Sequence, residues 1–237
     1  AFSKLDYQTD RVALGNVYRF SVRYSSLFVV PVAFLVMCLS GPAVSTLFGS
    51  TYDSAGLFLS LLAVSYLYAA FGNFSNGNLI NSQGDTSFNL KLALVTACIG
   101  FPMGYLLIMN FGVLGLIATS LTACIPSLIL ALRFIKNKYG ASVDWVSSGK
   151  ILFSSGVTAF LTYVLVSMLS LASWLELFVG TLFFVVVFLF VALFSRTVGR
   201  CDVANLRGVA AGLGFISKPV NVVLSLIEKL ISVFKLG

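Results

Sequence analysis

Histidine is absent from this chain, and charged residues make up only 10% of it. Without histidine the sequence lacks the commonest general acid or base and the commonest ligand of transition metals. It also shows no Gly-rich phosphate loop, no paired carboxylates within reach of one another and no nucleophile with a base partner. These absences predict that the protein is not an enzyme and that it holds no metal or cofactor.

The cysteines are few and far apart. Of the four, Cys38, Cys98 and Cys124 fall within apolar stretches, and Cys201 stands outside them. No two have the spacing of a zinc site or of a disulfide framework. We therefore interpret the cysteines as small hydrophobic residues.

Long apolar runs make up most of the chain, which is 59% hydrophobic. Soluble domains typically carry about 25% charged residues, so this composition indicates a protein that folds in lipid. The runs divide into six segments of membrane-spanning length. Their predicted bounds are 27–47, 57–76, 92–109, 113–132, 151–171 and 177–194. We expect an all-α polytopic membrane protein whose transmembrane region is residues 1–194.

Polar loops and one tight turn are expected to separate the predicted spans. Residues 1–26 are polar and are expected to form a cytoplasmic loop leading into the first helix, and residues 81–89 and 133–150 form two further loops. No charged residue occurs in 92–132, a stretch roughly twice as long as one membrane helix requires. Asn110-Phe111-Gly112 in its middle has turn-forming chemistry, so we expect two helices there.

The basic residues are distributed asymmetrically. With six spans, all 15 Lys and Arg residues fall on one side of the membrane, and the other side receives only Asp53 and Glu176. Because cytoplasmic segments are enriched in Lys and Arg, both ends of the chain are predicted to lie in the cytoplasm. The same rule accounts for the net charge of +7, so that charge does not indicate nucleic-acid binding.

Residues 195–237 form a separate tail with apolar residues at helical spacing, among them Val220, Leu224, Ile227 and Ile231. This pattern predicts an amphipathic helix lying on the cytoplasmic leaflet. A seventh span is the alternative. Glu228 and Lys229 in mid-segment argue against it, since a charge at mid-bilayer costs about 3 kcal/mol or more.

No predicted span carries an acidic or basic residue in its interior, but the second one ends in polar residues. Asn73 and Asn76, beside Gly72, are spaced to share one helix face. An unpartnered amide in hydrocarbon would cost several kcal/mol. These residues therefore either form hydrogen bonds between helices or line a cavity that contacts a polar substrate, where Tyr66 is a further candidate.

Glycine and proline mark candidate hinges. Gly100 and Gly104 form a GxxxG pair around Pro102, which fits either close helix packing or a bend that lets the helix flex. The same two alternatives apply to three other prolines within the spans, namely Pro31, Pro42 and Pro126.

Three basic residues stand at the predicted cytoplasmic mouths of the first and third spans: Arg19, Arg23 and Lys91. They either act only as topology signals or contact the phosphate of a lipid carrier. Arginine suits the second role because its forked donors match phosphate oxygens.

A series of short motifs then occurs in a recognisable order. The first span and its flanks contain Arg23, Pro31, Gly41-Pro42, Leu47-Phe48-Gly49, Tyr52 and Ala55. Further motifs are GNLINSQGDTSFNLK after the second span and FGVLGLIATSLTA, with Gly112, Gly115, Ala118 and Thr119. This series resembles the second half of O-antigen-type polysaccharide flippases of the multidrug/oligosaccharidyl-lipid/polysaccharide superfamily. The chain departs from the family at Leu116-Ile117, where small residues are common.

The resemblance implies the C-terminal part of a two-lobe transporter that works by alternating access. Its expected partners are membrane lipid, a polyprenyl- or dolichyl-diphosphate-linked oligosaccharide, and an N-terminal lobe of the same protein, but not nucleic acid. A start at Ala1 rather than Met agrees with that expectation.

Three other functions stay open on the sequence. A cation-coupled multidrug exporter of the same superfamily would need an acidic residue within a span. A membrane scaffold subunit that transports nothing would have tightly packed spans and no polar cavity. A membrane-embedded glycosyltransferase or polymerase would need carboxylates near the outer loops, where only Asp53 and Glu176 are found.

Overall fold

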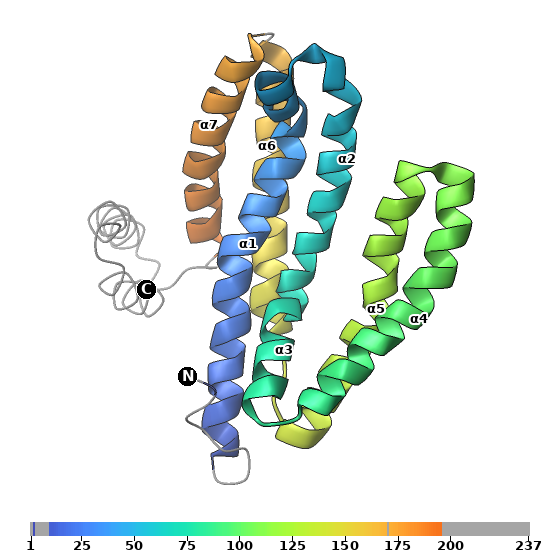
Figure 1. Ribbon diagram of the computed structural model, residues 1–237. Coiled ribbons are helices and arrows are strands. Elements are labelled where there is room, and N and C mark those ends of the chain that lie inside the picture. Colours follow the sequence, from blue (N-terminus) through green and yellow to red (C-terminus); the bar gives the residue numbers. More distant parts are fainter. Residues whose placement is uncertain (1, 3–9, 170, 196–237) are drawn as a thin grey trace.

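The computed structural model describes residue 2 and residues 10–169 and 171–195, and this part of the chain is helical without strands (Figure 1). The elements are α1 (Arg11–Phe48), η2 (Ser50–Tyr52), α2 (Asp53–Ala63), η3 (Val64–Phe71), α3 (Asn73–Ser82), α4 (Thr86–Phe111), α5 (Val113–Tyr139), α6 (Trp145–Leu169) and α7 (Ser173–Phe194), where η denotes a 3₁₀-helix. The all-α prediction is confirmed. The amphipathic helix predicted for 195–237 lies, apart from Ser195, outside the described residues.

Six stretches within the described residues are long and apolar enough to cross a membrane. They are Arg11–Phe48, Asp53–Phe71, Thr86–Phe111, Val113–Tyr139, Trp145–Leu169 and Ser173–Ala192. Each overlaps one predicted span, which confirms a multi-pass membrane protein.

The first helix is much longer than predicted, because α1 begins at Arg11 and not after a loop at 1–26. Its 38 residues extend about 57 Å at 1.5 Å per residue, against a hydrocarbon thickness of about 30 Å. A search for apolar runs detects only the part of a helix that lies in lipid. The first turns of α1 are instead held by protein, since Leu14, Tyr18 and Val22 are buried.

The predicted loops 81–89 and 133–150 are longer than the loops in the structure, because the helices beside them also extend beyond their apolar runs. Only 83–85 separate α3 from α4, and only 140–144 separate α5 from α6. These two loops lie at the same end of the bundle as the start of α1 (Figure 1). We call this the basic end, because Arg11, Lys136 and Lys138 lie there.

The second span is not one continuous α-helix as expected for 57–76. The chain passes from α2 into η3, and Gly72 then adopts a left-handed conformation with φ +81° before α3 begins. Contacts from two neighbouring helices hold this stretch in place. Ser26 Oγ donates a 3.0 Å hydrogen bond to the carbonyl of Ala69, and Tyr68 Oη donates a 2.9 Å bond to the carbonyl of Leu121.

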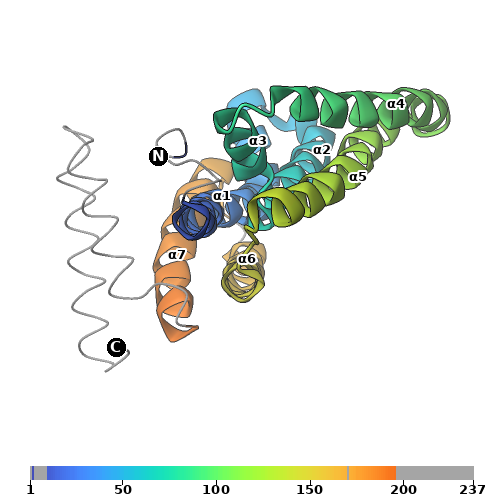
Figure 2. The ribbon, with the colours of Figure 1, turned by 90° about the horizontal axis from the view of Figure 1, so that it is seen from below.

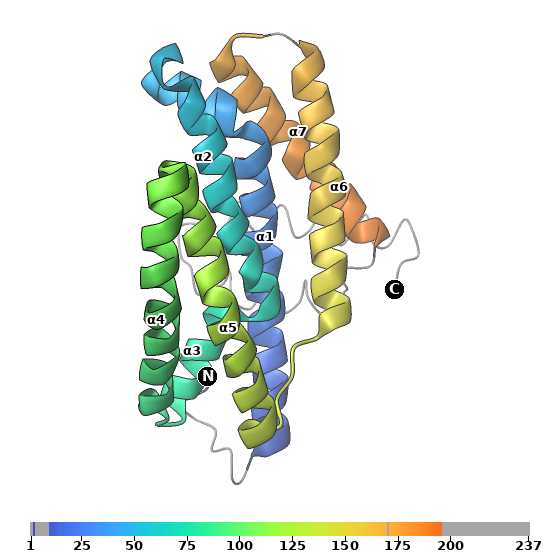
Figure 3. The same ribbon diagram turned by 90° about the vertical axis from the view of Figure 1, so that its right-hand side faces the viewer.

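Helix α1 lies at the centre of the described bundle and packs against α2, η3, α6 and α7. Helices α4 and α5 run side by side (Figure 3) and pack more extensively on one another than on the rest. Seen along the bundle, this hairpin projects to one side of α1, α6 and α7 (Figure 2). The side chains of α4 are mostly exposed, as expected where a helix faces lipid or another membrane segment.

Candidate functional site

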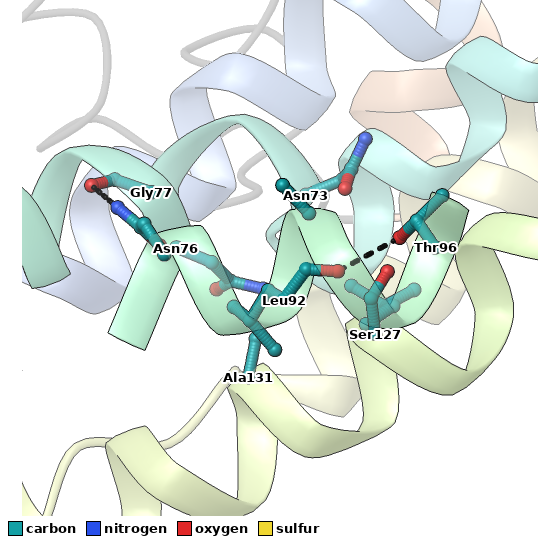
Figure 4. Close-up of a pocket in the computed structure, with 10 residues that line it drawn as sticks. Asn73, Asn76, Gly77, Leu92, Thr96, Ser127 and Ala131 are labelled. Atoms are coloured by element: carbon teal, nitrogen blue, oxygen red, sulfur yellow. Dashed lines mark hydrogen bonds between the residues drawn. The ribbon is translucent and has the colours of Figure 1, made fainter. Parts of the chain in front are cut away.

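A polar pocket of about 230 Å³ lies among α3, α4 and α5 (Figure 4). Its lining consists of Asn73, Asn76, Gly77, Asn89, Leu92, Ala93, Thr96, Ser127, Leu128 and Ala131. Five of these ten side chains are amides or hydroxyls, and none carries a charge. A pocket of this composition offers hydrogen bonds to a neutral polar group.

The break at Gly72 places the amides at the pocket. A side chain at this position would lie 2.9 Å from Tyr18 Oη and 3.0 Å from Asn76 Oδ1, so the close approach of α1 to α3 requires glycine there. The chain restarts as α3 directly after Gly72, and the first turns of this helix bring Asn73, Asn76 and Gly77 to the pocket wall.

Asn76 is the most constrained of these residues, with only 4% of its surface exposed. Its Oδ1 accepts a 2.6 Å hydrogen bond from Tyr18 Oη. Its Nδ2 is buried and has no hydrogen-bond partner. Buried polar atoms are nearly always paired in folded proteins, so this donor is an exception among the described residues.

Asn89 lines the pocket from α4, across from α3, and its side chain bonds two residues of α3. Its Nδ2 donates a 3.1 Å bond to the carbonyl of Gly77 and a 2.7 Å bond to Asn81 Oδ1. Figure 4 shows the first of these bonds, and also the bond of Thr96 Oγ1 to the carbonyl of Leu92 at 3.0 Å. These contacts connect α3 to the first turns of α4.

Sequence reasoning identified two of the polar lining residues and missed three. Asn73 and Asn76 both line the pocket, in agreement with the prediction that they share a face. Asn89, Thr96 and Ser127 were not singled out. The seven-residue spacing of Asn89 and Thr96 places them on one helix face and is the signal that points to both.

Tyr66 does not belong to this pocket. Its side chain is 53% exposed, and it lines a separate apolar groove of about 680 Å³ between α1 and the α2–η3 segment. The aliphatic lining of that groove includes Val32, Val36 and Leu62.

The three candidate phosphate ligands are not gathered at the pocket either. Arg19 Nη2 donates a 3.3 Å bond to Ser142 Oγ, and the positive charge of Arg23 acts on Asp144. Arg19 and Arg23 of α1 are thus directed to the loop 140–144. Lys91 is exposed on α4 and is not among the lining residues.

Asp144 immediately precedes α6. Its carboxylate accepts hydrogen bonds from the Ser147 hydroxyl at 2.6 Å and from the backbone N–H groups of Val146 and Ser147 at 3.2 Å. The Ser147 hydroxyl contributes most to holding the pKa of Asp144 below its usual value, and burial opposes it. The two backbone bonds and the charge of Arg23 add to the lowering.

A second polar cluster lies at the basic end and consists of Asp85, Lys138 and Tyr139. Lys138 Nζ lies 2.6 Å from both carboxylate oxygens of Asp85, and Tyr139 Oη donates a further hydrogen bond to Oδ2. Burial raises the pKa of Asp85, but the bonds from Lys138 and Tyr139 and the charge of Lys138 outweigh it, so this pKa is lowered. The cluster connects the α3–α4 turn to the last turn of α5.

The GxxxG pair packs α4 on α5. A Cβ added at Gly104 would stand 3.4 Å from Thr119 Cγ2, and one at Gly100 would stand 3.5 Å from Ala123 Cβ. The four hinge prolines all lie within helices that continue past them: Pro31 and Pro42 in α1, Pro102 in α4 and Pro126 in α5. Their role as hinges stays a prediction.

Comparison with known proteins yields two matches. Residues 1–57 match the model of a family described as polysaccharide biosynthesis protein. Over 209 residues the chain is 21% identical to a Haloferax volcanii protein named as a probable low-salt glycan biosynthesis flippase. The match covers 86% of this chain and 43% of that relative, so the chain spans less than half of its length. No solved structure matches the chain. Both matches support the resemblance to polysaccharide biosynthesis and flippase proteins that the motifs indicate.

Proposed function

We propose that this chain is part of a flippase that moves a lipid diphosphate-linked oligosaccharide across the cell membrane for the assembly of a surface glycan. The two matches support a transporter rather than an enzyme. The observation that carries the proposal is the uncharged polar pocket within the membrane-spanning bundle, whose wall includes three asparagines and two hydroxyl residues.

In this proposal the basic end lies in the cytoplasm, because Lys and Arg are concentrated on cytoplasmic segments. The pocket then stands nearer the cytoplasmic face, where a lipid-linked glycan made in the cytoplasm would enter. The rest of the transport path is supplied by an N-terminal lobe, and alternating access exposes the path to each side in turn.

The packing of the α4–α5 hairpin supports such a movement. These two helices form a well-packed pair through Gly100 and Gly104 and make fewer contacts with α1, α2 and α3. A hairpin of this kind moves as one body more readily than a helix buried on all sides.

The test uses the whole protein in its host. We expect deletion of its gene to abolish the surface glycan and to cause the lipid-linked precursor to accumulate in the cytoplasmic leaflet. Restoring the gene with Asn73→Leu, which replaces an amide of the pocket wall, is expected to leave most precursor untransported.

Asn110→Leu is the matched control. Asn110 is exposed near the α4–α5 turn, and among the described residues its side chain bonds only the carbonyl of Leu106 in its own helix, at 2.8 Å. The Asn110→Leu variant should restore the surface glycan fully when its abundance in the membrane equals that of Asn73→Leu. An unchanged surface glycan after deletion of the gene would overturn the proposed function.

A further inference from the structure

The pocket wall contains both donors and acceptors of hydrogen bonds. The Asn73 side chain makes no hydrogen bond to any described residue, so its amide offers both a donor and an acceptor. The hydroxyls of Thr96 and Ser127 donate to the carbonyls of Leu92 and Cys124, which leaves both hydroxyl oxygens as acceptors.

A ligand that satisfies this wall must itself donate and accept at neighbouring atoms. The hydroxyl groups of a sugar ring do so, because each carries one donor and two acceptor lone pairs. An amide beside two hydroxyl oxygens therefore complements adjacent ring hydroxyls. An apolar group such as an isoprenoid would leave the Asn73 amide and the two hydroxyl oxygens without partners.

A charged group fits the same wall poorly. No lining residue carries a charge, and Arg19 and Arg23 make their contacts with loop 140–144. A phosphate moved into this pocket would lose its water without gaining a cation. The volume of about 230 Å³ equals that of about eight waters at about 30 Å³ each, which suits one sugar ring rather than a chain of them.

We infer that the pocket formed by α3, α4 and α5 binds a single uncharged sugar unit of the carried glycan, while the diphosphate lies outside it. This inference rests on the proposed function and deepens it. It assigns glycan recognition to Asn73 and Thr96, and it removes the phosphate from the site.

The experiment measures equilibrium binding to the full-length protein in lipid nanodiscs. Two probes are compared: the lipid-linked glycan purified from a strain lacking the protein, and the corresponding polyprenyl diphosphate without sugar. The variants are Asn73→Ala on α3 and Thr96→Val on α4, with Asn110→Ala as the matched control on the same hairpin as Thr96.

We expect the wild-type protein to prefer the sugar-bearing lipid. Each pocket variant should weaken binding of that lipid about tenfold and leave binding of the sugar-free lipid unchanged. Asn110→Ala should leave both affinities unchanged.

Two results would overturn the inference while leaving the proposed function standing. One is equal weakening of both lipids, which would place the diphosphate in the pocket. The other is full retention of the preference in both pocket variants. If the deletion strain accumulates no lipid-linked glycan, or the wild-type protein binds neither lipid, the proposed function fails and the inference falls with it.

Discussion

Tyr18 Oη donates a 2.6 Å hydrogen bond to Asn76 Oδ1, and this bond connects the first half of α1 to the first turn of α3. Both residues are buried, Tyr18 completely. Since Oδ1 accepts the bond from α1, the other end of the amide, Nδ2, is the end without a partner. The contact therefore fixes the orientation of the Asn76 amide beside the pocket.

Removing this bond should destabilise the protein. Tyr18→Phe keeps the ring but leaves the buried Asn76 amide unpaired at both ends, which we expect to cost about 1–3 kcal/mol. The measurement is thermal unfolding in detergent, with Tyr105→Phe as the control because Tyr105 is exposed. Equal melting temperatures for the two variants would show that the Tyr18 bond contributes nothing.

The left-handed glycine before α3 offers a second test. Gly72 and Gly84 both have φ +81°, but a Cβ would be crowded by Tyr18 and Asn76 only at Gly72. Gly84→Ala should cost about 1–2 kcal/mol for the backbone conformation alone. Gly72→Ala should cost clearly more and should weaken glycan binding as well. Similar losses of unfolding free energy for both variants would contradict the crowding around Gly72.

The α4–α5 hairpin depends on a close approach at its turn. A Cβ at Gly115 would collide with the carbonyl of Leu107, whereas one at Gly100 would make an ordinary contact with Ala123. Gly115→Ala should therefore destabilise by about 1–3 kcal/mol, and Gly100→Ala should be close to neutral. Chemical denaturation of the two variants in detergent compares them directly. The reverse order of stability would show that the hairpin turn does not pack as described.

The Asp85 cluster predicts a dependence on pH. Because the pKa of Asp85 is lowered from 3.8 in the folded protein, its stabilisation is present above about pH 4 and is lost as the pH falls through the folded pKa. Since both partners are partly exposed, the contribution is on the order of 1 kcal/mol.

Asp85→Asn should lower stability at neutral pH and reduce its loss on acidification. Asp144, whose pKa is lowered as well, should account for part of the loss that remains. Unfolding measured from pH 7 to pH 3 tests this, with Asp53→Asn at the opposite end of the bundle as the control. A steeper loss in Asp85→Asn than in the wild-type protein would exclude the proposed role of the cluster.

Local chemistry singles out two of the residues that line the pocket, whereas contacts between distant segments leave no trace in a linear pattern. The functional role of these residues stays a prediction. Asn73 and Asn76 were identified because amides in an apolar run are costly wherever they lie. Asn89 was placed in a loop, because nothing in a linear pattern shows that α4 begins at Thr86 and reaches Gly77 of α3. Arg19 and Arg23 were expected at a cavity mouth, yet their contacts are with a loop far along the chain.

The sequence by itself determined the six spans and the asymmetry of charge. Lipid requires each crossing segment to be apolar and to satisfy its own backbone, and that requirement acts on one segment at a time. Only the tertiary structure decided where the second span breaks, which polar side chains meet, and that the pocket carries no charge. Those features depend on distances between α1, α3, α4 and α5, and such distances arise only when the helices pack together.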